Sequence, residues 1–317
     1  MSAVRVGVIG VGHLGYHHAR IYRALPEAEL VGIVDASDER ASRACDEFGV
    51  PRFESVEKLI EAGITAASVV VPTVAHREIA VRLLSAGVDV LVEKPIAPTV
   101  AEAAEMVGVA AENGRILQVG HVERFNGAVI ALFSAVRMPR FIECHRLSPF
   151  PNRGSDVSVV LDLMIHDLDI VLALDGTAVE SVDAVGVPVL STYEDIANVR
   201  LRFASGCVAN LTSSRVSVER MRKIRIFESD AYVSTDYTEQ QVMVYRKKPG
   251  KQAAGASMMD LINVEALPVH REEPLKMELA SFLECVREHK RPLVAGEDGL
   301  RALQVAEDVV RFIRERA

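Results

Sequence analysis

The chain has 317 residues, of which 49% are hydrophobic and 25% charged, and its formal net charge is −8. This length suits two domains, and the composition is that of an ordinary globular protein. The acidic balance argues against broad binding of nucleic acids. No apolar run is long enough to span a bilayer, and the first expected strand begins so close to Met1 that we expect no signal peptide.

The cysteines argue for a reducing compartment. Cys45, Cys144, Cys207 and Cys285 lie far apart in the sequence and form no C-x-x-C pair. We therefore expect four buried free thiols in a cytoplasmic protein, and we expect no structural zinc site.

The first segment, Val4–Gly15, predicts a buried strand, a tight turn and the start of a helix. Its glycines have the spacing G-x-G-x-x-G. In a nucleotide-binding unit the first glycine permits the turn, the second lets a pyrophosphate approach the backbone, and the third lets helix and strand pack closely. The phosphates would then lie on the N–H groups at the start of the helix. The residues predicted to bind a dinucleotide here are Gly10, Gly12, His13, Leu14 and Gly15.

Asp35 ends the second expected strand and lies 20 residues after Gly15, where a dinucleotide-binding unit has an acidic residue. A carboxylate there accepts hydrogen bonds from both ribose hydroxyls and repels a 2′-phosphate, so it favours NAD over NADP. Arg40, five residues later, is expected on the surface of the next helix rather than folded back over the ribose. Without the glycine motif, Asp35 would be interpreted as a loop or helix-capping carboxylate.

Strand and helix patterns alternate up to about residue 120. Helices are expected at 13–25, 38–49, 55–63, 74–87 and 99–114, and strands at 51–53, 64–72, 88–95 and 116–121. This alternation predicts a parallel sheet with helices on both faces, which binds ligands at the carboxyl ends of its strands. The residues expected near this edge are Pro72, Thr73, His76, Glu93, Lys94 and His121. All of these except His121 are predicted to contact the cofactor.

The pattern changes after residue 120. Helices are expected at 125–137, 158–174, 274–289 and 297–316, and period-2 stretches at 141–148, 179–189, 196–214, 223–229, 231–237 and 241–247. These stretches predict an antiparallel or mixed sheet joined by hairpins. The chain is therefore predicted to be α/β, with a doubly wound parallel Rossmann sheet in 1–120. The second domain, 121–317, is predicted to be α/β (α+β) with a largely antiparallel sheet, and helices from about 274 to 317 close it.

Lys94 follows an apolar strand and is flanked by Glu93 and Pro95. A desolvated lysine next to the positive nicotinamide ring has a lowered pKa, and it can orient a substrate hydroxyl or share its proton. The alternative is a solvated lysine at a strand end. Pro95 keeps the backbone of Lys94 extended in either case.

Asp162 and His166 lie four residues apart in the expected helix 158–174, and therefore on one face, among apolar neighbours. Burying both is costly unless they have partners. Histidine suits proton transfer near neutral pH, so His166 is predicted to accept the proton of a substrate hydroxyl. Asp162 would help to position the His166 side chain or the substrate. One alternative is an intrahelical Asp–His pair at the surface. The other is a metal site formed with Asp169, which no further cluster of Cys or His residues supports.

Polar residues after the domain boundary are candidates for substrate binding. Arg124 and Asn126 lie at the crossover between domains, where ligand clefts form, and are predicted to bind substrate oxygens. Arg146 and Arg153 flank a Pro/Gly-rich loop and suit a phosphate, and Arg153 belongs to the predicted substrate-binding set. A basic run fits an anion site, a subunit interface or solvated strand charge. This run consists of Arg215, Arg220, Arg222, Lys223 and Arg225.

Four motifs in this order, GVIGVGHLG, VVVPTVAH, VLVEKP and DLMIHDLD, resemble those of the Gfo/Idh/MocA oxidoreductases, over nearly the whole chain. The resemblance implies NAD(P)-linked dehydrogenation of a sugar or polyol CH–OH group. It implies an N-terminal Rossmann domain and a C-terminal α/β domain whose open sheet forms dimers or tetramers. It also implies that Lys94, Asp162 and His166 are the catalytic residues. We expect no metal, because NAD makes one unnecessary for hydride transfer.

Within that family, the segments GHVERFN, RGSDVSVVLDLMIHDLDI and SSRVSVERMRKIRIFESDAY are similar to those of members that oxidise the C3 hydroxyl of UDP-N-acetylglucosamine. Those members supply a 3-keto sugar nucleotide to an aminotransferase in lipid A synthesis. The resemblance implies a UDP diphosphate held by Arg146, Arg153 or the basic run, and Asp35 favours NAD as the cofactor. Dehydrogenation of another sugar or of inositol, and a non-catalytic NAD-binding sensor, remain the alternatives.

Overall fold

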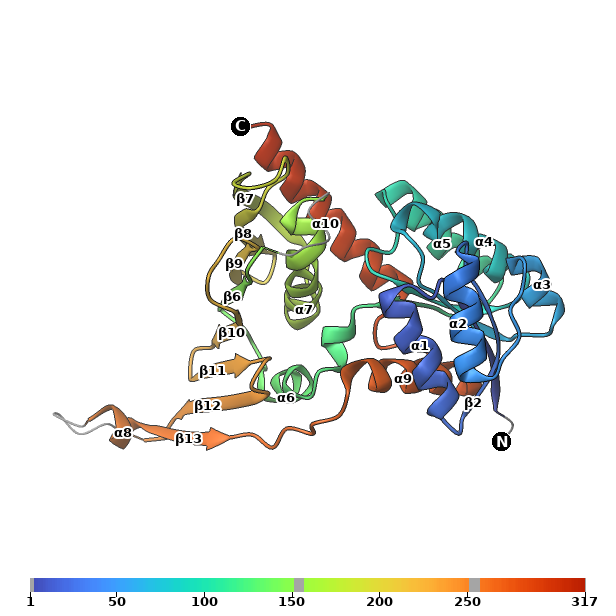
Figure 1. Cartoon of the computed structure of the whole chain (residues 1–317). Helices are drawn as coiled ribbons and strands as arrows, with labels where there is room; N and C mark the ends of the chain where they lie inside the picture. The colour runs from blue at the N-terminus through green and yellow to red at the C-terminus, as the bar shows by residue number, and fades with distance from the viewer. Residues whose placement is uncertain (1–2, 151–156, 251–256, 317) are drawn as a thin grey trace. The chain divides into compact units, whose positions relative to one another are not determined.

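The computed structural model describes residues 3–150, 157–250 and 257–316 (Figure 1). Its contacts divide the chain into two units. The first unit holds Met1–Val122 and Glu273–Leu303, and the second holds Glu123–Glu272 and Gln304–Ala317. We expected a boundary near residue 120 with both closing helices in the second domain, whereas the structure groups Glu273–Leu303 with the first unit.

A five-stranded parallel sheet forms the centre of the first unit, with the strand order β2-β1-β3-β4-β5. Its strands are β1 (Val4–Ile9), β2 (Ala28–Val34), β3 (Ala66–Val69), β4 (Asp89–Glu93) and β5 (Leu117–Gly120). Its helices are α1 (His13–Ala24), α2 (Asp38–Phe48), α3 (Val56–Glu61), η1 (Thr73–Ala75), α4 (His76–Ser85), α5 (Val100–Glu112), α9 (Pro274–Glu288) and the first part of α10 (Gly296–Arg314). The predicted doubly wound parallel sheet is confirmed.

Apolar packing explains why α9 belongs to the first unit. Its buried residues Leu279, Phe282, Leu283 and Val286 recur at helical spacing and share a core with Val4 of β1. Burial of each such side chain contributes roughly 1.5–3 kcal/mol. The same apolar face would suit either sheet, so the sequence pattern of α9 did not indicate which one it covers.

The third expected strand, 51–53, does not form. Arg52 makes a single bridge to Ile33 of β2, and the chain then turns into α3. Pro51 has no N–H to donate, so only its carbonyl bonds, to the Ile33 N–H at 3.2 Å. The ring of Phe53 lies over Gly32, where a Cβ would come within 2.3 Å of it. The prediction of a strand here was wrong because one bridge does not extend into a ladder.

An eight-stranded sheet forms the centre of the second unit, with the order β13-β12-β11-β10-β6-β9-β8-β7. Its strands are β6 (Phe141–Leu147), β7 (Val179–Val187), β8 (Ile196–Phe203), β9 (Val208–Ser214), β10 (Met221–Phe227), β11 (Ala231–Asp236), β12 (Gln241–Lys247) and β13 (Ile262–Ala266). Strands β6 and β9 pair in parallel, and the other neighbours are antiparallel. The predicted, largely antiparallel sheet is confirmed.

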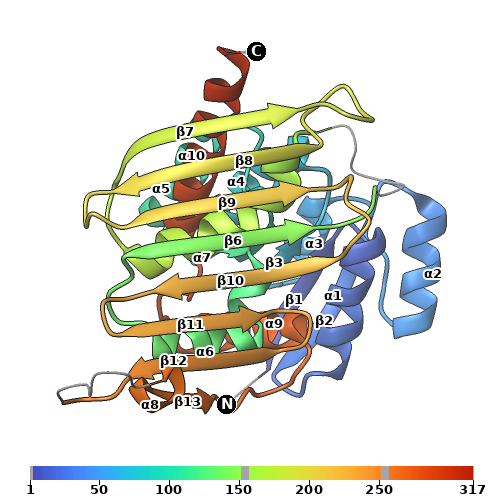
Figure 2. The same ribbon diagram turned by 90° about the vertical axis from the view of Figure 1, so that its left-hand side faces the viewer.

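Helices lie against one face of this sheet, as Figure 2 shows for α6 and α7 behind the strands. The helices of the second unit are η2 (Val122–Phe125), α6 (Gly127–Ala135), η3 (Val160–Met164), α7 (Ile165–Asp175), α8 (Met258–Leu261) and the end of α10. In β8, Ala197, Val199, Leu201 and Phe203 are buried, while the residues between them are exposed. Apolar side chains at every second position give a sheet one buried face.

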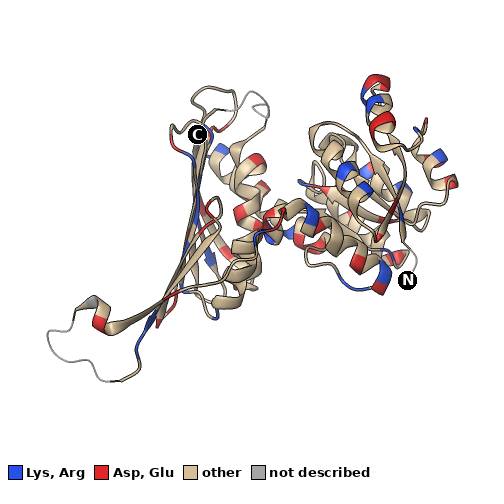
Figure 3. Cartoon of the chain, turned by 60° about the horizontal axis from the view of Figure 1, so that its bottom comes forward, with Lys and Arg blue, Asp and Glu red and all other residues tan. Residues whose placement is uncertain are grey.

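Acidic and basic residues are mixed along the helices and strands (Figure 3). In the basic run, Lys223 lies 3.2 Å from Asp236, and Arg225 lies 2.9 Å from Glu143. These pairs join β10 to its neighbours β11 and β6, so part of the run is neutralised within the sheet. Among the described helices, none is both long and apolar enough to cross a membrane.

Candidate active site

The turn after β1 has the geometry that its glycine motif predicts. Gly10 has φ +88°, and a Cβ there would lie 2.4 Å from the carbonyl oxygen of Val70. A Cβ on Gly15 would lie 1.9 Å from the carbonyl oxygen of Gly10, whereas a Cβ on Gly12 would have no described heavy atom within 4 Å. Backbone packing therefore requires Gly10 and Gly15, and Gly12 leaves open space beside the turn.

The first turn of α1 suits an anion. Gly12 is the N-cap of this helix, and no side chain among the described residues caps it. First-turn N–H groups have no partner within a helix and lie at the positive end of its dipole. The predicted contacts His13 and Leu14 are exposed at this end. These features fit the pyrophosphate of a dinucleotide.

Asp35 follows β2 and bonds back to the glycine turn. Its Oδ2 accepts a hydrogen bond from the Val11 N–H, and its Oδ1 from the Ser37 N–H, both at 2.7 Å. Arg40 Nη2 lies 3.0 Å from Oδ1, so Arg40 reaches Asp35 although its side chain is 58% exposed. Burial raises the pKa of Asp35, but these N–H groups and Arg40 outweigh it and lower the pKa below its usual value. Asp35 is therefore a carboxylate at neutral pH.

A pocket at the carboxyl edge of the sheet joins these residues to the end of β3. It is lined by Gly10, Gly12, Asp35, Val71 and Pro72, among others. The strand order reverses between β1 and β3, and open parallel sheets bind ligands at such a point. The structure thus brings together, within the first unit, the glycine turn, the acidic residue and Pro72.

His76 links the segment after β3 to the segment after β4. Its imidazole is buried, with Nε2 2.9 Å from the Val71 carbonyl oxygen and Nδ1 3.0 Å from the Pro95 carbonyl oxygen. Burial lowers the pKa of His76, and the hydrogen bonds to these carbonyls offset the effect only in part. Thr73, another predicted contact, begins η1 just before it. A role of His76 and Thr73 at the cofactor stays a prediction.

The shifted pKa of His76 makes stability depend on pH. The unfolded chain takes up a proton at this residue near pH 6.5, whereas the folded protein resists it, so the free energy of unfolding falls as the pH drops through that range. We expect His76→Gln to lose less stability than the wild-type protein between about pH 7.5 and about pH 5.5. Urea titrations at each pH measure this, and an equal loss in both proteins would contradict the assigned shift.

Glu93 ends β4, and Lys94 follows it at the same edge of the sheet. The Glu93 carboxylate points inward, with Oε1 3.2 Å from His18 Nε2, and Oε2 accepts a hydrogen bond from the Lys94 N–H at 3.2 Å. His18 Nδ1 lies 3.1 Å from Ser68 Oγ. These contacts orient the backbone from which the half-buried Lys94 side chain extends. The prediction that Glu93 contacts the cofactor stays untested.

His18 and Ser68 were not among the predicted site residues. Both are buried, and the hydroxyl of Tyr22 lies 2.8 Å from Ser68 Oγ. His18 and Tyr22 are four residues apart, on the buried face of α1. That spacing is a usable signal, because two polar rings on the apolar face of a helix need polar partners.

Asp162 and His166 lie in the second unit, where one helix changes from π to α. Asp162 is within the π-helical turn η3, and His166 is in the first turn of α7. Both side chains are half-buried. The predicted helix is therefore present, and its first turn is π-helical where the later part is α-helical. Single π-helical turns are frequent at functional sites.

The two aspartates after His166 are buried and pair with arginines. Arg146 donates to Asp167 from Nε at 2.9 Å and from Nη2 at 2.8 Å, and to Glu123 from Nη1 at 2.9 Å. Arg124 Nη1 lies 3.4 Å from Asp169. All three nitrogens of the buried Arg146 therefore bond to carboxylates within the unit, and binding of a diphosphate by this arginine stays a prediction.

The remaining predicted substrate contacts have structural partners or lie outside the described residues. The Arg124 guanidinium lies 4.9 Å from the centre of the Phe133 ring. Asn126 is the N-cap of α6, and its Oδ1 accepts a hydrogen bond from the Ala128 N–H at 3.0 Å. Arg153 lies outside the described residues. Binding of substrate by these three residues stays a prediction.

Two family descriptions match the chain in succession. Residues 4–121 match the oxidoreductase family with an NAD-binding Rossmann fold, and residues 127–234 match the Gfo/Idh/MocA C-terminal domain. The chain belongs to the Gfo/Idh/MocA family. The matched N-terminal domain is the one that carries the glycine turn and Asp35, and its description as NAD-binding agrees with the geometry found there.

Among its Gfo/Idh/MocA relatives is the UDP-N-acetylglucosamine 3-dehydrogenase of Acidithiobacillus ferrooxidans, 37% identical over 307 residues, which are 96% of each chain. A solved structure of that enzyme superposes with a TM-score of 0.91 at 35% identity, over 99% of both chains. The scyllo-inositol 2-dehydrogenase (NAD(+)) of Bacillus subtilis is 28% identical, over 95% of this chain and 92% of its own. Both relatives are dehydrogenases, in agreement with the resemblance found in the sequence.

Proposed function

We propose that the protein is an NAD-dependent dehydrogenase that oxidises the C3 hydroxyl of UDP-N-acetylglucosamine to a 3-keto sugar nucleotide. The observation that carries the proposal is the 37% identity to the Acidithiobacillus ferrooxidans enzyme over 96% of both chains. The inositol dehydrogenase of Bacillus subtilis is only 28% identical over a similar span. The substrate named for the first relative is therefore preferred over inositol or another sugar.

NAD, when bound, supplies the acceptor for the hydride that leaves the substrate carbon. The first unit offers residues that fit this cofactor. The glycine turn and the N–H groups at the start of α1 suit its pyrophosphate, and Asp35 suits its adenosine ribose. Because Asp35 is charged at neutral pH, it disfavours the 2′-phosphate of NADP. Pro72, Thr73, His76, Glu93 and Lys94 complete the proposed contacts.

Three side chains carry the proton chemistry of the proposed reaction. His166 accepts the proton of the substrate hydroxyl on a ring nitrogen, for which the neutral imidazole is suited near pH 7. Lys94 donates a hydrogen bond from its ammonium group to the hydroxyl oxygen and stabilises the negative charge that develops there. Asp162, four residues before His166, orients the imidazole or a substrate hydroxyl.

The proposal extends to the role of the protein in the cell. An aminotransferase would consume the 3-keto product on the way to the diamino sugar of lipid A, in the cytoplasm, and the dehydrogenase would act as a homodimer or homotetramer. Arg124, Asn126 and Arg153 would contact the sugar nucleotide. The candidate from another class is a non-catalytic NAD-binding sensor, which has no need of Lys94 and His166.

The proposal is tested by mixing the purified protein with NAD and UDP-N-acetylglucosamine and following the absorbance of NADH. A 3-aminotransferase with its amino donor removes the keto product and draws the reaction forward. We expect NADH to form with this sugar nucleotide and not with inositol or free N-acetylglucosamine. Turnover of inositol alone would change the substrate within the family, and binding of NAD without turnover of any of these would favour the sensor.

Asp35 is expected to set the preference for NAD. Asp35→Ser removes the charge that repels a 2′-phosphate and leaves Arg40, now 3.0 Å from the carboxylate, available to bind one. We expect the ratio of kcat/KM for NADP to that for NAD to rise about 10²-fold, which corresponds to about 2.7 kcal/mol. Steady-state kinetics with both cofactors measure the ratio. The double variant Asp35→Ser, Arg40→Ala lacks the guanidinium, so it should lose most of the NADP use that Asp35→Ser gains. An unchanged ratio in Asp35→Ser would show that other residues select the cofactor.

A further inference from the structure

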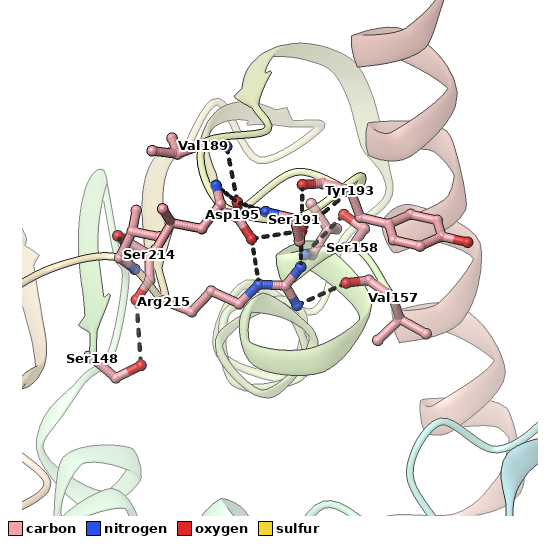
Figure 4. A network of polar contacts seen from close by, with 12 residues as sticks. Ser148, Val157, Ser158, Val189, Ser191, Tyr193, Asp195, Ser214 and Arg215 are labelled. Carbon is pink, nitrogen blue, oxygen red and sulfur yellow. Dashed lines mark hydrogen bonds and ion pairs between the residues drawn. The ribbon is translucent and has the colours of Figure 1, made fainter. Parts of the chain in front are cut away.

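Arg215 and Asp195 form a fully buried ion pair in the second unit (Figure 4). Both side chains are 0% exposed, and Arg215 Nε lies 2.8 Å from Asp195 Oδ1. Taking two charges out of water is costly, and such a pair adds little net stability over apolar residues of the same size. Neither residue takes part in the proposed reaction. The remaining contacts of the pair indicate what it does.

Asp195 holds the loop between β7 and β8. Its Oδ2 accepts hydrogen bonds from the N–H groups of Val189, Leu190 and Ser191 at 2.8, 2.6 and 2.8 Å. Its Oδ1 accepts a further bond from the Ser191 hydroxyl at 2.7 Å. Burial raises the pKa of Asp195, but these bonds and Arg215 outweigh it and hold the pKa far below its usual value. The carboxylate is thus charged and fully bonded.

Arg215 connects this loop to the chain that leads into η3. Its Nη2 donates to Ser191 Oγ at 3.0 Å, and its Nη1 donates to the Val157 carbonyl oxygen at 2.8 Å. Arg215 itself directly follows β9. One planar guanidinium therefore joins β9, the β7–β8 loop and Val157 (Figure 4). This arrangement needs the fixed fork of arginine, which a lysine ammonium does not reproduce.

Ser158, the next residue, bonds directly to the turn that carries Asp162. Its carbonyl oxygen accepts hydrogen bonds from the N–H groups of Leu161 and Asp162, each at 3.1 Å. Its hydroxyl accepts a bond from the Val160 N–H at 3.2 Å. Arg215 is thus connected to the backbone of Asp162 in three steps. A hydrogen bond joins Arg215 to Val157, a peptide bond joins Val157 to Ser158, and a second hydrogen bond joins Ser158 to Asp162.

Val159, the residue after Ser158, is also hydrogen-bonded to this part of the structure. The Val159 N–H donates to the carbonyl oxygen of Glu194 at 2.9 Å, and Glu194 directly precedes Asp195. The Arg215 N–H in turn donates to the Asp195 carbonyl oxygen at 2.9 Å. Both neighbours of Ser158 are therefore hydrogen-bonded to the network around Arg215 and Asp195, which restricts how the π-helical turn can start.

We propose that Arg215 and Asp195 are positioning residues for Asp162 and His166. They act through the backbone, by fixing the start of η3, and they touch neither substrate nor cofactor. This inference rests on the proposed function, in which Asp162 and His166 act at the substrate hydroxyl. Misplacing a catalytic group by about 1 Å lowers the rate by about 10²-fold, so a loosened start of this helix lowers kcat.

The test uses Arg215→Lys, which keeps the charge but loses the fork. We expect kcat to fall about 10- to 100-fold, while the affinity for NAD, measured directly by isothermal titration calorimetry, stays within about twofold. Arg200→Lys is the matched control, because Arg200 is exposed on β8 and its side chain bonds across the strands, to Asn210 Oδ1 at 3.0 Å. This control is expected to keep the wild-type kcat.

Amide hydrogen exchange in the ligand-free protein provides a readout that does not depend on the substrate. We expect faster exchange at Val159, Leu161 and Asp162 in Arg215→Lys, with β8 and β9 as protected as in the wild-type protein. If the wild-type protein does not oxidise UDP-N-acetylglucosamine, the proposed function fails, and this comparison still tests the inference about positioning.

Three outcomes would overturn the inference. These are a wild-type kcat in Arg215→Lys, unchanged exchange at the start of η3, and a uniform loss of protection over the second unit, which would mean that Arg215 only stabilises the fold. If Arg215→Lys does not fold, Ser191→Ala removes the half-buried hydroxyl that bonds to Nη2. A smaller change in the same direction would then support the inference, and no change would refute it.

Discussion

Replacing His166 with asparagine is expected to lower kcat for the oxidation of UDP-N-acetylglucosamine by about 10²- to 10⁴-fold, the range for loss of a general base. Asparagine keeps a polar group at the same helix position but cannot take up a proton near neutral pH. Lys94→Met is expected to cause a loss of similar size, because the charge that develops on the substrate oxygen loses its ammonium partner. For His166→Asn, the affinity for NAD should stay within about twofold, since the NAD-binding residues belong to the first unit and His166 to the second.

Two variants control for the substitutions themselves. His145→Asn changes a half-buried histidine of β6, and Lys58→Met changes an exposed lysine of α3 that pairs with Glu61. Both controls are expected to keep the wild-type kcat. Steady-state production of NADH gives kcat, and isothermal titration calorimetry gives the affinity for NAD. Wild-type turnover in His166→Asn or in Lys94→Met would show that the assigned proton chemistry is wrong.

Replacing Gly12 or Gly15 with alanine is expected to change different properties of the protein. Gly15→Ala should lower the stability of the fold, and Gly12→Ala should lower the affinity for NAD. In Gly15→Ala the new Cβ would lie 1.9 Å from the carbonyl oxygen of Gly10, and backbone atoms cannot move aside as a side chain can. Overpacking of this kind costs about 3 kcal/mol of the free energy of unfolding. In Gly12→Ala the Cβ meets no described atom within 4 Å, so stability should change by no more than about 0.5 kcal/mol.

The loss in Gly12→Ala is expected instead in the affinity for NAD. A methyl group in the open space beside the turn keeps the pyrophosphate away from the backbone N–H groups. Loss of one hydrogen bond to a charged group costs about 1.5–3 kcal/mol, or about 10- to 100-fold in affinity. Gly108→Ala, within α5 and with an equally open Cβ position, is the matched control for both measurements. Equal effects of Gly12→Ala and Gly15→Ala on stability would contradict these roles.

The nucleotide-binding unit could be predicted in most of its detail because its signals are local. Gly10, Gly12 and Gly15 act within one turn, and Asp35 follows at a spacing that the strand–helix–strand unit imposes. The structure confirms the sheet and places Gly10, Gly12 and Asp35 beside one pocket at the point where the strand order reverses. Four motifs in one order, GVIGVGHLG, VVVPTVAH, VLVEKP and DLMIHDLD, also indicated the family, which the matches over residues 4–121 and 127–234 confirm.

The interpretation of the basic run shows where local signals fail. Arg215 was grouped with Arg220 and Arg222 as a possible anion site, interface or solvated charge. The structure buries Arg215 completely against Asp195, which lies 20 residues earlier and had no recognisable signal in the sequence. Arg222 stays 54% exposed, near Glu123. A charge pattern along a strand does not reveal which of its members will meet a buried partner.

The sequence by itself predicted most of the elements and the candidate site residues, because hydrophobic period, glycine spacing and strand ends depend on neighbours in the chain. Only the tertiary structure decided which sheet α9 covers, that 51–53 makes one bridge instead of a strand, and that the helix of Asp162 starts with a π-helical turn. It also decided that Arg215 reaches Val157, 58 residues earlier in the chain. These features depend on contacts between segments that are distant in the sequence. Such contacts exist only in the packed chain, so local sequence patterns do not reveal them.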